Sequence, residues 1–285
     1  MTRTEESSRA VVHLLPAKAA ALTGSAEVLR ALPRREQRRV GSFVFFDHFG
    51  PTSAEHGAMD VPPHPHVGLQ TVTYLFSGAI EHRDSLGSVQ VISPGDVNWM
   101  TAGHAITHAE TVVPGSGTLH GIQTWVGLPR ERRKMEPSFE HFSAAVLPRI
   151  EFPGASAVVI AGTLGEHRSP VPSFLPLTYL DLSLQPGAAL ALPVQPDHEL
   201  ALYVAVGEVT LGATAVPAGV LATLGGGNTL HLGSKQAARA LLFGGVPLPE
   251  PTAIWWNFIV DTVEEGRACE ADWKAGKFPR VPGFE

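Results

Sequence analysis

The chain has a single cysteine, Cys269, among its 285 residues. One cysteine cannot form an intrachain disulfide, and it cannot build a zinc site made of several cysteines. Histidine and carboxylate side chains therefore remain as the candidate metal ligands. A chain with so little cysteine suits a reducing compartment, and we expect a cytoplasmic protein.

Long apolar runs are also missing from the sequence. No uninterrupted apolar stretch approaches the roughly 18 residues that a membrane-spanning helix needs. The first 25 residues lack the compact apolar segment of a secretory signal, because His13, Pro16 and Lys18 interrupt their apolar pieces. The sequence predicts a soluble protein with no membrane association.

Charged residues are few and unevenly distributed. They make up 17% of the chain, compared with about 25% in an average protein. Residues 1–150 carry 14 basic and 14 acidic residues, whereas residues 151–285 carry 7 and 13. Neither half has the basic excess that phosphate backbones attract, so we expect no direct binding of nucleic acid.

Strand signals dominate what is present. Short β-branched or aromatic runs end near Gly, Pro, Asn or Asp, a pattern typical of an all-β sandwich or barrel. Helix signals are scarce until Asp261-Thr262, which can cap one helix of 12–14 residues that Gly276 would end. The expected strands are 41–50, 70–78, 88–93, 119–128, 156–162 and 201–212.

A weak internal repeat predicts two β modules in tandem. His108 follows Pro94 by 14 positions, and His231 follows Pro217 by the same spacing. We therefore expect an N-terminal domain over residues 1–150 and a C-terminal domain over 151–285 that includes the helix. Ten of the 13 histidines precede residue 150, which places the expected function in the first module.

Two short motifs carry the chemistry of the first module. They are His64-Pro65-His66 and His108-Ala109-Glu110. Residues i and i+2 of a strand point to the same face, so each motif would project two polar side chains together. An isolated His-x-His motif is usually an exposed pair, but two such motifs on neighbouring strands of a barrel converge. Three imidazoles and one carboxylate suit a divalent first-row metal.

The remaining histidines receive smaller roles. His48, beside Asp47, is interpreted either as a group that orients a ligand imidazole or as a surface pair at a strand end. His120 is assigned to the core of a strand, and His104 is a weaker candidate for a cavity residue. His82 is interpreted as a loop residue.

Several segments resemble the pirin family of bicupins. They are FVFFDHFGP (43–51), HPHVGLQTVTYLFSGAIEHRDSLGS (64–88), SPGDVNWMTAGHAITHAE (93–110), LHGIQTWVGLP (119–129) and, near the end, IWWNFIVDTVEEG (254–266). The resemblance implies two tandem cupin (jelly-roll) β-barrels, with metal in the N-terminal barrel alone. It also implies His64, His66, His108 and Glu110 as the metal ligands.

The chain departs from the family pattern at a few positions. Gln70 stands where pirins commonly keep a glutamate, and Val67 stands where they often carry an arginine after the HPH motif. In the second module His198 is not part of an HxH pair, and Gly233 replaces the residue corresponding to Glu110. The second barrel is therefore expected to be metal-free and to cover and shape the site.

The resemblance implies a quercetin 2,3-dioxygenase-like activity. A flavonol would chelate the metal through its 3-hydroxyl and 4-oxo groups, react with O₂ and release carbon monoxide on ring opening. Glu110 would be the catalytic residue that accepts the hydroxyl proton. Fe(II) is the expected cofactor, although the ligand set also accepts Mn, Co, Ni, Cu or Zn.

Two other functions remain open at this point. Some pirins resemble non-enzymatic, metal-binding regulators that interact with transcription or metabolic proteins, and the acidic second half could face such a partner. A zinc-dependent cupin isomerase is the lower alternative. Its anionic substrate would need a basic residue near the metal, and only Arg83 lies near the motifs in sequence.

Overall fold

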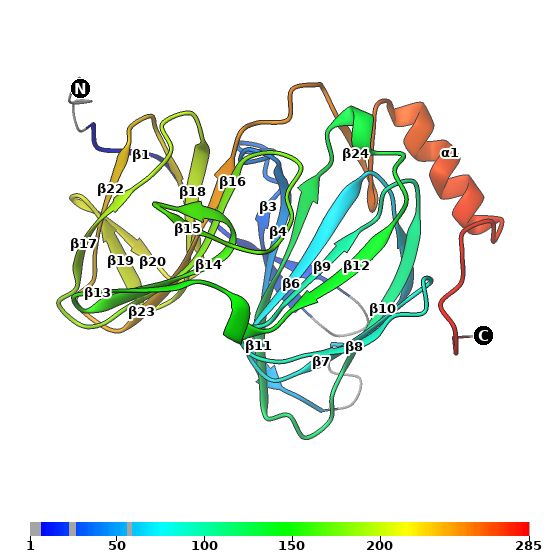
Figure 1. The fold of residues 1–285 in the computed structure, drawn as a ribbon, viewed down its shortest axis with the longest axis horizontal. Helices are drawn as coiled ribbons and strands as arrows, with labels where there is room; N and C mark the ends of the chain where they lie inside the picture. The colour runs from blue at the N-terminus through cyan, green and yellow to red at the C-terminus, as the bar shows by residue number, and fades with distance from the viewer. Residues whose placement is uncertain (1–6, 23–26, 56–58, 285) are drawn as a thin grey trace. The chain divides into compact units, whose positions relative to one another are not determined.

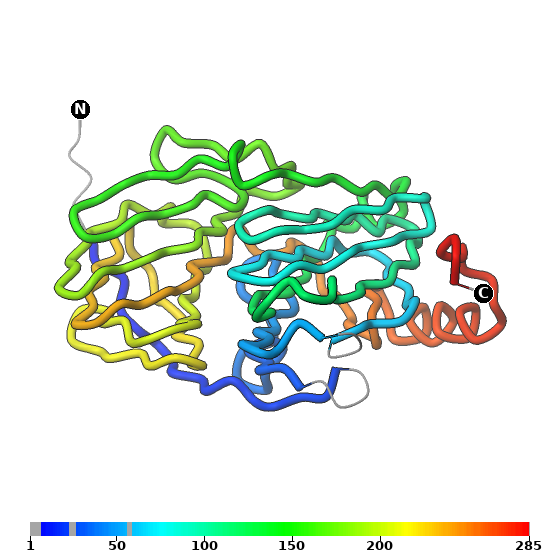
Figure 2. The backbone as a smooth tube through the Cα atoms, turned by 90° about the horizontal axis from the view of Figure 1, so that it is seen from below, coloured from blue at the N-terminus to red at the C-terminus, as the bar shows by residue number. Residues whose placement is uncertain are grey.

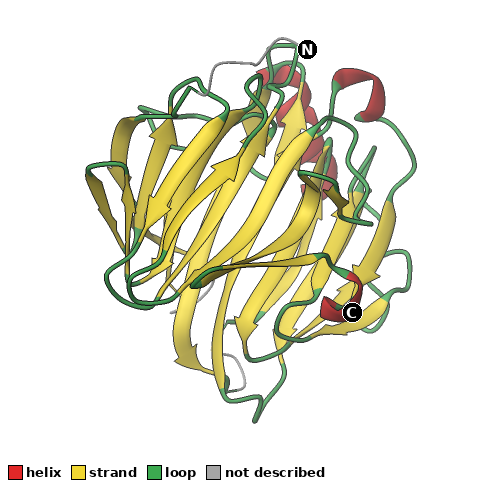
Figure 3. Cartoon of the chain, turned by 60° about the vertical axis from the view of Figure 1, so that its left-hand side comes forward, coloured by secondary structure: helices red, strands yellow, loops and turns green. Residues whose placement is uncertain are grey.

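Strands make up most of the structure, a computed structural model that describes residues 7–22, 27–55 and 59–284 (Figure 3). The chain groups into two compact units, and each unit draws on three segments. The histidine-rich unit comprises residues 19–30, 44–145 and 248–285. The leucine-rich unit comprises residues 1–18, 31–43 and 146–247. The prediction of an all-β fold is confirmed.

The histidine-rich unit is built from a seven-stranded and a four-stranded sheet (Figure 1). Its buried apolar cluster joins Phe49 and Leu75 of the larger sheet to Ile80 and Val112 of the smaller one. The two sheets therefore face each other as the two sides of a barrel. In spatial order, the larger sheet holds β12 (Ser138–Phe142), β9 (Val97–Thr101), β6 (Leu69–Ser77), β11 (Thr118–Gly127), β4 (Phe43–Ser53), β3 (Glu27–Leu32) and β2 (Lys18–Ala21). The smaller sheet holds β5 (Val61–His66), β10 (Ile106–Val112), β7 (Ile80–Asp84) and β8 (Val89–Ile92).

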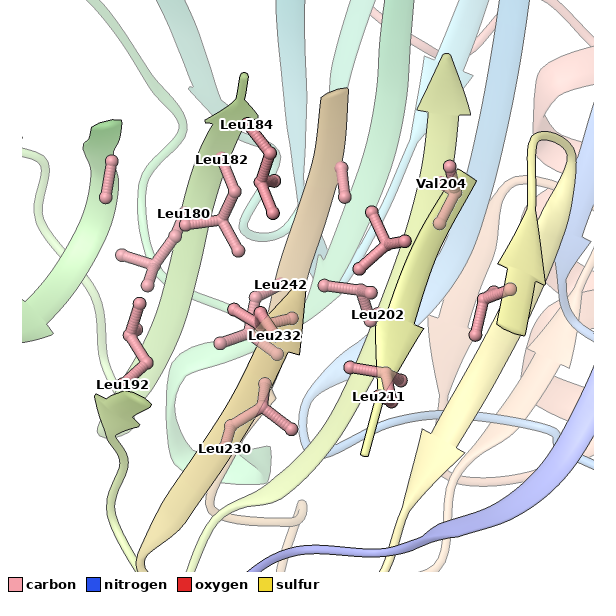
Figure 4. Packing of buried hydrophobic residues seen from close by; sticks show 14 of the residues in the cluster. Leu180, Leu182, Leu184, Leu192, Leu202, Val204, Leu211, Leu230, Leu232 and Leu242 are labelled. Carbon is pink, nitrogen blue, oxygen red and sulfur yellow. The ribbon is translucent and has the colours of Figure 1, made fainter. Parts of the chain in front are cut away.

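The leucine-rich unit repeats this plan with an apolar interior. Leucines such as Leu182, Leu202, Leu232 and Leu242 point toward one another from its two sheets (Figure 4). One sheet holds β1 (Val11–Pro16), β21 (Val220–Leu224), β18 (Glu199–Val206), β23 (Ala238–Gly245), β16 (Leu177–Leu184), β14 (Ala155–Leu164), β13 (Arg149–Phe152) and β15 (His167–Arg168). The other sheet holds β17 (Ala189–Pro193), β22 (Thr229–Gly233), β19 (Glu208–Leu211) and β20 (Thr214–Pro217).

The predicted C-terminal helix is confirmed as α1 (Val263–Lys274), which has 12 residues. The Thr262 hydroxyl caps it by accepting a hydrogen bond of 3.2 Å from the backbone N–H of Glu265. Two short 3₁₀ turns, η1 (Arg130–Arg132) and η2 (Ala144–Val146), complete the helical content of the described residues. None of the helices in the described ranges is long and apolar enough to cross a membrane.

The expected strand at 201–212 is wrong, because Gly207 divides it into β18 and β19. Gly207 adopts φ +76°, and a Cβ atom at this position would lie 2.4 Å from the carbonyl oxygen of Ala237. A left-handed residue that lacks room for a side chain has to be glycine, and it turns the chain from one sheet into the other.

The two units do not correspond to the two halves of the sequence, because each unit includes a segment from the opposite end of the chain. Strand β1, from the N-terminus, pairs with β21 of the leucine-rich unit, as the blue and yellow segments in Figure 2 show. The C-terminal hairpin of β24 (Ala253–Trp255) and β25 (Phe258–Val260) groups with α1 in the histidine-rich unit. There Phe258 packs on Val67 and stacks with Phe278. The helix expected with the second module thus groups with the strands of the first.

The leucine core provides a direct test of the fold. We expect Leu202→Ala to lower the free energy of unfolding by about 2–5 kcal/mol, because Leu202 is fully buried and its truncation leaves a cavity. Urea denaturation measures this loss. The matched control is Val206→Ala in the same strand, since Val206 is 44% exposed. Equal effects of the two substitutions would contradict this packing of the leucine core.

Candidate metal centre

Two adjacent strands of the smaller sheet bring the predicted ligands together. In the antiparallel pairing of β5 and β10, His108 lies opposite His64 and Ile106 lies opposite His66. A register shift between His108 and Glu110 places Glu110 opposite Val61. Because side chains alternate along a strand, the three histidines share one face of this sheet.

The three imidazole rings form a compact triangle. The ring centroids of His64 and His108 are 4.3 Å apart. The ring centroid of His66 lies 5.0 Å from that of His64 and 5.1 Å from that of His108. One ligand nitrogen from each ring lies within 4.8 Å of the other two. His66 and His108 are both only 1% exposed. This arrangement could hold a metal ion.

Each imidazole uses its Nδ1 atom for a contact within the protein. Nδ1 of His64 lies 2.9 Å from the carbonyl oxygen of Pro62, and Nδ1 of His66 lies 3.2 Å from that of Asn257. A carbonyl oxygen only accepts hydrogen bonds, so both Nδ1 atoms carry the proton and both Nε2 atoms keep a free electron pair. Nδ1 of His108 lies 3.3 Å from Nδ1 of His82.

The third imidazole leaves a buried polar atom without a partner. Nε2 of His108 is buried and has no hydrogen-bond partner. An unsatisfied buried nitrogen is costly, by about 1–3 kcal/mol, and a metal ion would remove this cost. The donor set therefore fits a divalent metal.

Burial keeps these imidazoles neutral. It lowers the pKa of His64 and lowers the pKa values of His66 and His108 well below their ordinary value. The neighbouring imidazoles lower the pKa values of His66 and His108 further. A neutral imidazole has the free electron pair that a metal requires, so the uncharged state suits a ligand.

Glu110 is near this triangle but groups differently from the prediction. Its carboxylate falls within 4.8 Å of ligand atoms of His108 and His82, in a set that overlaps with the first at His108. The Thr73 hydroxyl lies 2.8 Å from Oε1 of Glu110 and 2.8 Å from Oε1 of Gln123. Glu110 and Gln123 both line the cavity next to the imidazoles, so these contacts hold the carboxylate at its wall.

The interpretation of His82 as a loop residue is wrong. His82 lies within strand β7, is 2% exposed and contacts His108. Along β7 the buried residues Ile80, His82 and Asp84 alternate with the partly exposed Glu81 and Arg83. This alternation is the sequence signal that could have placed His82 in a strand. The residues after Asp84, which include Ser85, Gly87 and Ser88, are typical of a turn and favoured the interpretation of His82 as a loop residue.

The other residues singled out in the sequence lie outside the triangle of rings. Gln70 is buried and donates a 2.9 Å hydrogen bond to the hydroxyl of Thr101. Nε2 of His48 lies 2.7 Å from Nε2 of the partly buried His120, and His48 itself is only 4% exposed, so the alternative of a surface pair is wrong for His48. His104 is half exposed, with its Nδ1 3.2 Å from the carbonyl oxygen of Met135.

A largely apolar cavity opens onto His64 and His66. Its empty volume is about 570 Å³, including space open to solvent. Phe45 and Trp125 stack on its wall with ring centroids 4.0 Å apart, and the Trp125 ring meets His66 edge-on at 5.1 Å. The other lining residues are Leu22, Val28, Asp47, Phe49, Met59, Val61, His64, Ile80, Glu110 and Gln123.

Asp47, which lines this cavity, forms an ion pair with Arg30, which is not a lining residue. Arg30 binds both carboxylate oxygens of Asp47, at 2.9 and 2.8 Å, and its guanidinium lies 4.6 Å from the centre of the Phe45 ring. Burial raises the pKa of Asp47, and the bonds to Arg30 offset part of this effect. The pair therefore contacts the aromatic wall of the cavity through Phe45.

Comparisons with known proteins agree with this architecture. Residues 25–126 match the family model described as Pirin, and residues 179–279 match the one described as Pirin C-terminal cupin domain. The chain is 41% identical to a pirin-like protein of Caulobacter vibrioides over 269 residues, which cover 92% of both chains. The chain belongs to the pirin family. The expected fold of two cupin barrels is confirmed.

Solved structures of other proteins share this fold. A quercetin 2,3-dioxygenase from Acinetobacter baumannii superposes with a TM-score of 0.91 at 35% identity, covering 96% of this chain and 93% of that one. A bacterial pirin from Escherichia coli, solved in complex with nickel(II), has a TM-score of 0.64 at 18% identity, with coverage of 82% and 99%. The second likeness shows the fold alone.

Burial of His48 predicts a loss of stability in acid. Burial and the neighbouring His120 lower the pKa of His48 from 6.5 to about 4. The unfolded chain therefore binds a proton below pH 6.5 that the folded protein does not accept until about pH 4. Stability falls as the pH decreases between these values, by about 3 kcal/mol for this residue, and is restored as the pH rises.

Urea denaturation of metal-free protein at several pH values tests this prediction. His48→Asn should lose that part of the pH dependence, because asparagine does not titrate. The control is His13→Asn, since His13 is exposed and its substitution should leave the pH dependence unchanged. A wild-type pH dependence that survives in His48→Asn would disprove the assignment.

Proposed function

We propose that this pirin is a metal-dependent dioxygenase that cleaves a flavonol-like substrate with O₂. The observation that carries the proposal is the close grouping of three neutral imidazoles, two of which, His64 and His66, line an aromatic-walled cavity together with Glu110. His64, His66, His108 and Glu110 are the proposed metal ligands. The name of the Acinetobacter baumannii structure supports the substrate class.

Fe(II) is the proposed metal, and the choice rests on the reaction with O₂. Three neutral nitrogens and one carboxylate also accept Mn, Co, Ni, Cu or Zn. When bound, the metal would supply Lewis acidity toward the substrate hydroxyl and a redox centre for O₂.

The cavity walls would bind the flat substrate. Phe45 and Trp125 present a stacked aromatic surface next to His66, which suits a planar polyphenol better than a sugar. Apolar residues such as Phe49 and Ile80 exclude water from the ring that is cleaved. These residues orient the substrate so that its chelating oxygens face the imidazoles.

Glu110 is the proposed proton acceptor. The Thr73 hydroxyl lies 2.8 Å from its Oε1 and holds the carboxylate toward the cavity. A substrate hydroxyl that approaches the imidazoles would meet this carboxylate and transfer its proton to it. Oε1 of Gln123 lies 2.8 Å from the same hydroxyl, which has one proton and donates to one of these two acceptors at a time.

The isomerase alternative is disfavoured by the position of the basic residues. None of the described residues that line the cavity is Lys or Arg. Arg83 lies on the face of β7 opposite to that of His82 and Asp84. On that face it donates a 2.6 Å hydrogen bond to Glu81. A sugar phosphate would therefore meet no cation at the cavity wall.

His66→Ala tests the assigned site. Loss of one of three imidazoles should reduce the bound metal to a small fraction of one equivalent and abolish oxygen-dependent bleaching of quercetin. Elemental analysis and an oxygen electrode measure the two effects. Flavonol cleavage that survives in His66→Ala would overturn the site. A wild-type protein that binds metal but consumes neither flavonol nor O₂ would favour the regulatory alternative.

Glu110→Gln tests the proton acceptor. The amide keeps the shape of the side chain but cannot take the proton, so we expect kcat for quercetin to fall by about 10²–10⁴-fold. The control is Glu81→Gln on the adjacent strand, because Glu81 lies on the opposite face of β7. If Glu110→Gln retains wild-type kcat, the role of Glu110 as a base is wrong.

A further inference from the structure

A buried chain of three side chains ends at the proposed ligand His108. Oδ2 of Asp84 lies 3.1 Å from Nε2 of His82, and Nδ1 of His82 lies 3.3 Å from Nδ1 of His108. All three side chains are at most 2% exposed. Strands β7 and β10 set this geometry, because Asp84 lies directly opposite His108 and His82 lies opposite Glu110.

The carboxylate at the far end fixes the direction of the hydrogen bonds. Oδ1 of Asp84 accepts the backbone N–H groups of Leu86 and Ser88, at 2.9 and 3.0 Å, which leaves Oδ2 for His82. The pKa of Asp84 lies below its ordinary value because the bonds from His82 and Ser88 outweigh the effect of burial, which raises it. The Asp84 carboxylate is thus an acceptor only, and Nε2 of His82 must donate to it.

The hydrogen bond from His82 to Asp84 in turn sets the position of the proton on His108. A neutral imidazole that donates through Nε2 has an unprotonated Nδ1. In its neutral form His82 therefore accepts at Nδ1, and the neighbouring Nδ1 of His108 is then the donor. The proton on Nδ1 leaves Nε2 of His108 unprotonated, and this is the buried atom without a hydrogen-bond partner.

We propose that His82 and Asp84 are positioning residues that hold His108 in the tautomer able to bind the metal through Nε2. This inference rests on the proposed metal site, and it assigns a role to two residues outside the proposed ligand set. Backbone carbonyls do the same for His64 and His66, so His108 is the ligand whose tautomer depends on side chains.

His82 is poorly suited to be a metal ligand itself. Both of its ring nitrogens are engaged, one with Asp84 and one with His108. Its ring also stacks on Phe139 of β12, with centroids 4.2 Å apart and planes 11° from parallel. The ring plane is therefore fixed in an orientation that serves the hydrogen bonds, and the overlap of His82 with the second set of possible ligands reflects its contact with His108.

Asp84→Asn is the decisive variant because it reverses the direction of the hydrogen bonds from Asp84 through His82 to His108. It leaves every proposed metal ligand unchanged. The amide oxygen can keep the bonds to the backbone of Leu86 and Ser88, which places the amide N–H₂ group against His82. His82 must then accept at Nε2 and donate through Nδ1, so His108 is forced to carry its proton on Nε2. Metal binding would have to displace that proton.

Metal titration of the full-length protein measures the effect. We expect Asp84→Asn to weaken the affinity for Co(II) by about 10–100-fold, measured by competition with a chelator, while one equivalent still binds at saturation. His82→Phe keeps the stacking on Phe139 but removes the acceptor and should weaken binding similarly. His82→Gln offers an amide oxygen to His108 and should recover part of the affinity. The matched control is His48→Gln, because His48 is another buried histidine of the same unit. It should leave the affinity for Co(II) unchanged.

Nitrogen NMR of metal-free protein gives a readout that is independent of metal binding. The wild-type spectrum should show His108 protonated on Nδ1, and Asp84→Asn should shift it to the Nε2-protonated form. A wild-type protein that binds no metal would refute the proposed function, but the tautomer of His108 would still test the positioning role. Two results would overturn that role. One is an unchanged tautomer and affinity in Asp84→Asn. The other is a loss of one coordinating nitrogen in His82→Phe by X-ray absorption, which would make His82 a ligand.

Discussion

The face that carries His64, His66 and His108 depends on a hydrogen bond at the outer nitrogen of each imidazole. A histidine ring has two nitrogens, and a partner for Nδ1 decides whether Nε2 is free to bind a metal. Here Pro62 and Asn257 supply backbone carbonyls and His82 supplies an imidazole. The partners come from β5 itself, from the C-terminal hairpin and from β7, so the face needs several distant segments in place at once.

The hairpin shows how much structure supports a single contact. Trp256 adopts φ +50° in the two-residue turn between β24 and β25, a conformation that a side chain normally disfavours. This turn places the Asn257 carbonyl against His66, and the packing of Phe258 on Val67 holds the hairpin to the barrel. Backbone strain of this kind persists where surrounding contacts determine the conformation, as they do at this position.

The two barrels differ in what fills their interiors. In the leucine-rich unit, Leu230 and Leu232 of β22 point inward, so His231 between them is exposed. His198 is buried but lies 2.9 Å from the Thr178 hydroxyl. The repeat that relates His108 to His231 is therefore a repeat of spacing, while the inward-facing register differs. A one-residue change of register moves a whole set of side chains to the other face of a strand.

The sequence by itself determined the all-β class, the C-terminal helix and the common face of His64 and His66, because strand periodicity, helix capping and i, i+2 alternation are local properties. It did not reveal the roles of His82 and Asp84 or the contact of Asn257 with His66. Those depend on which strands become neighbours and on how closely their backbones approach, and residues far apart in the chain decide both. Only the tertiary structure could therefore show which nitrogen of each imidazole is free.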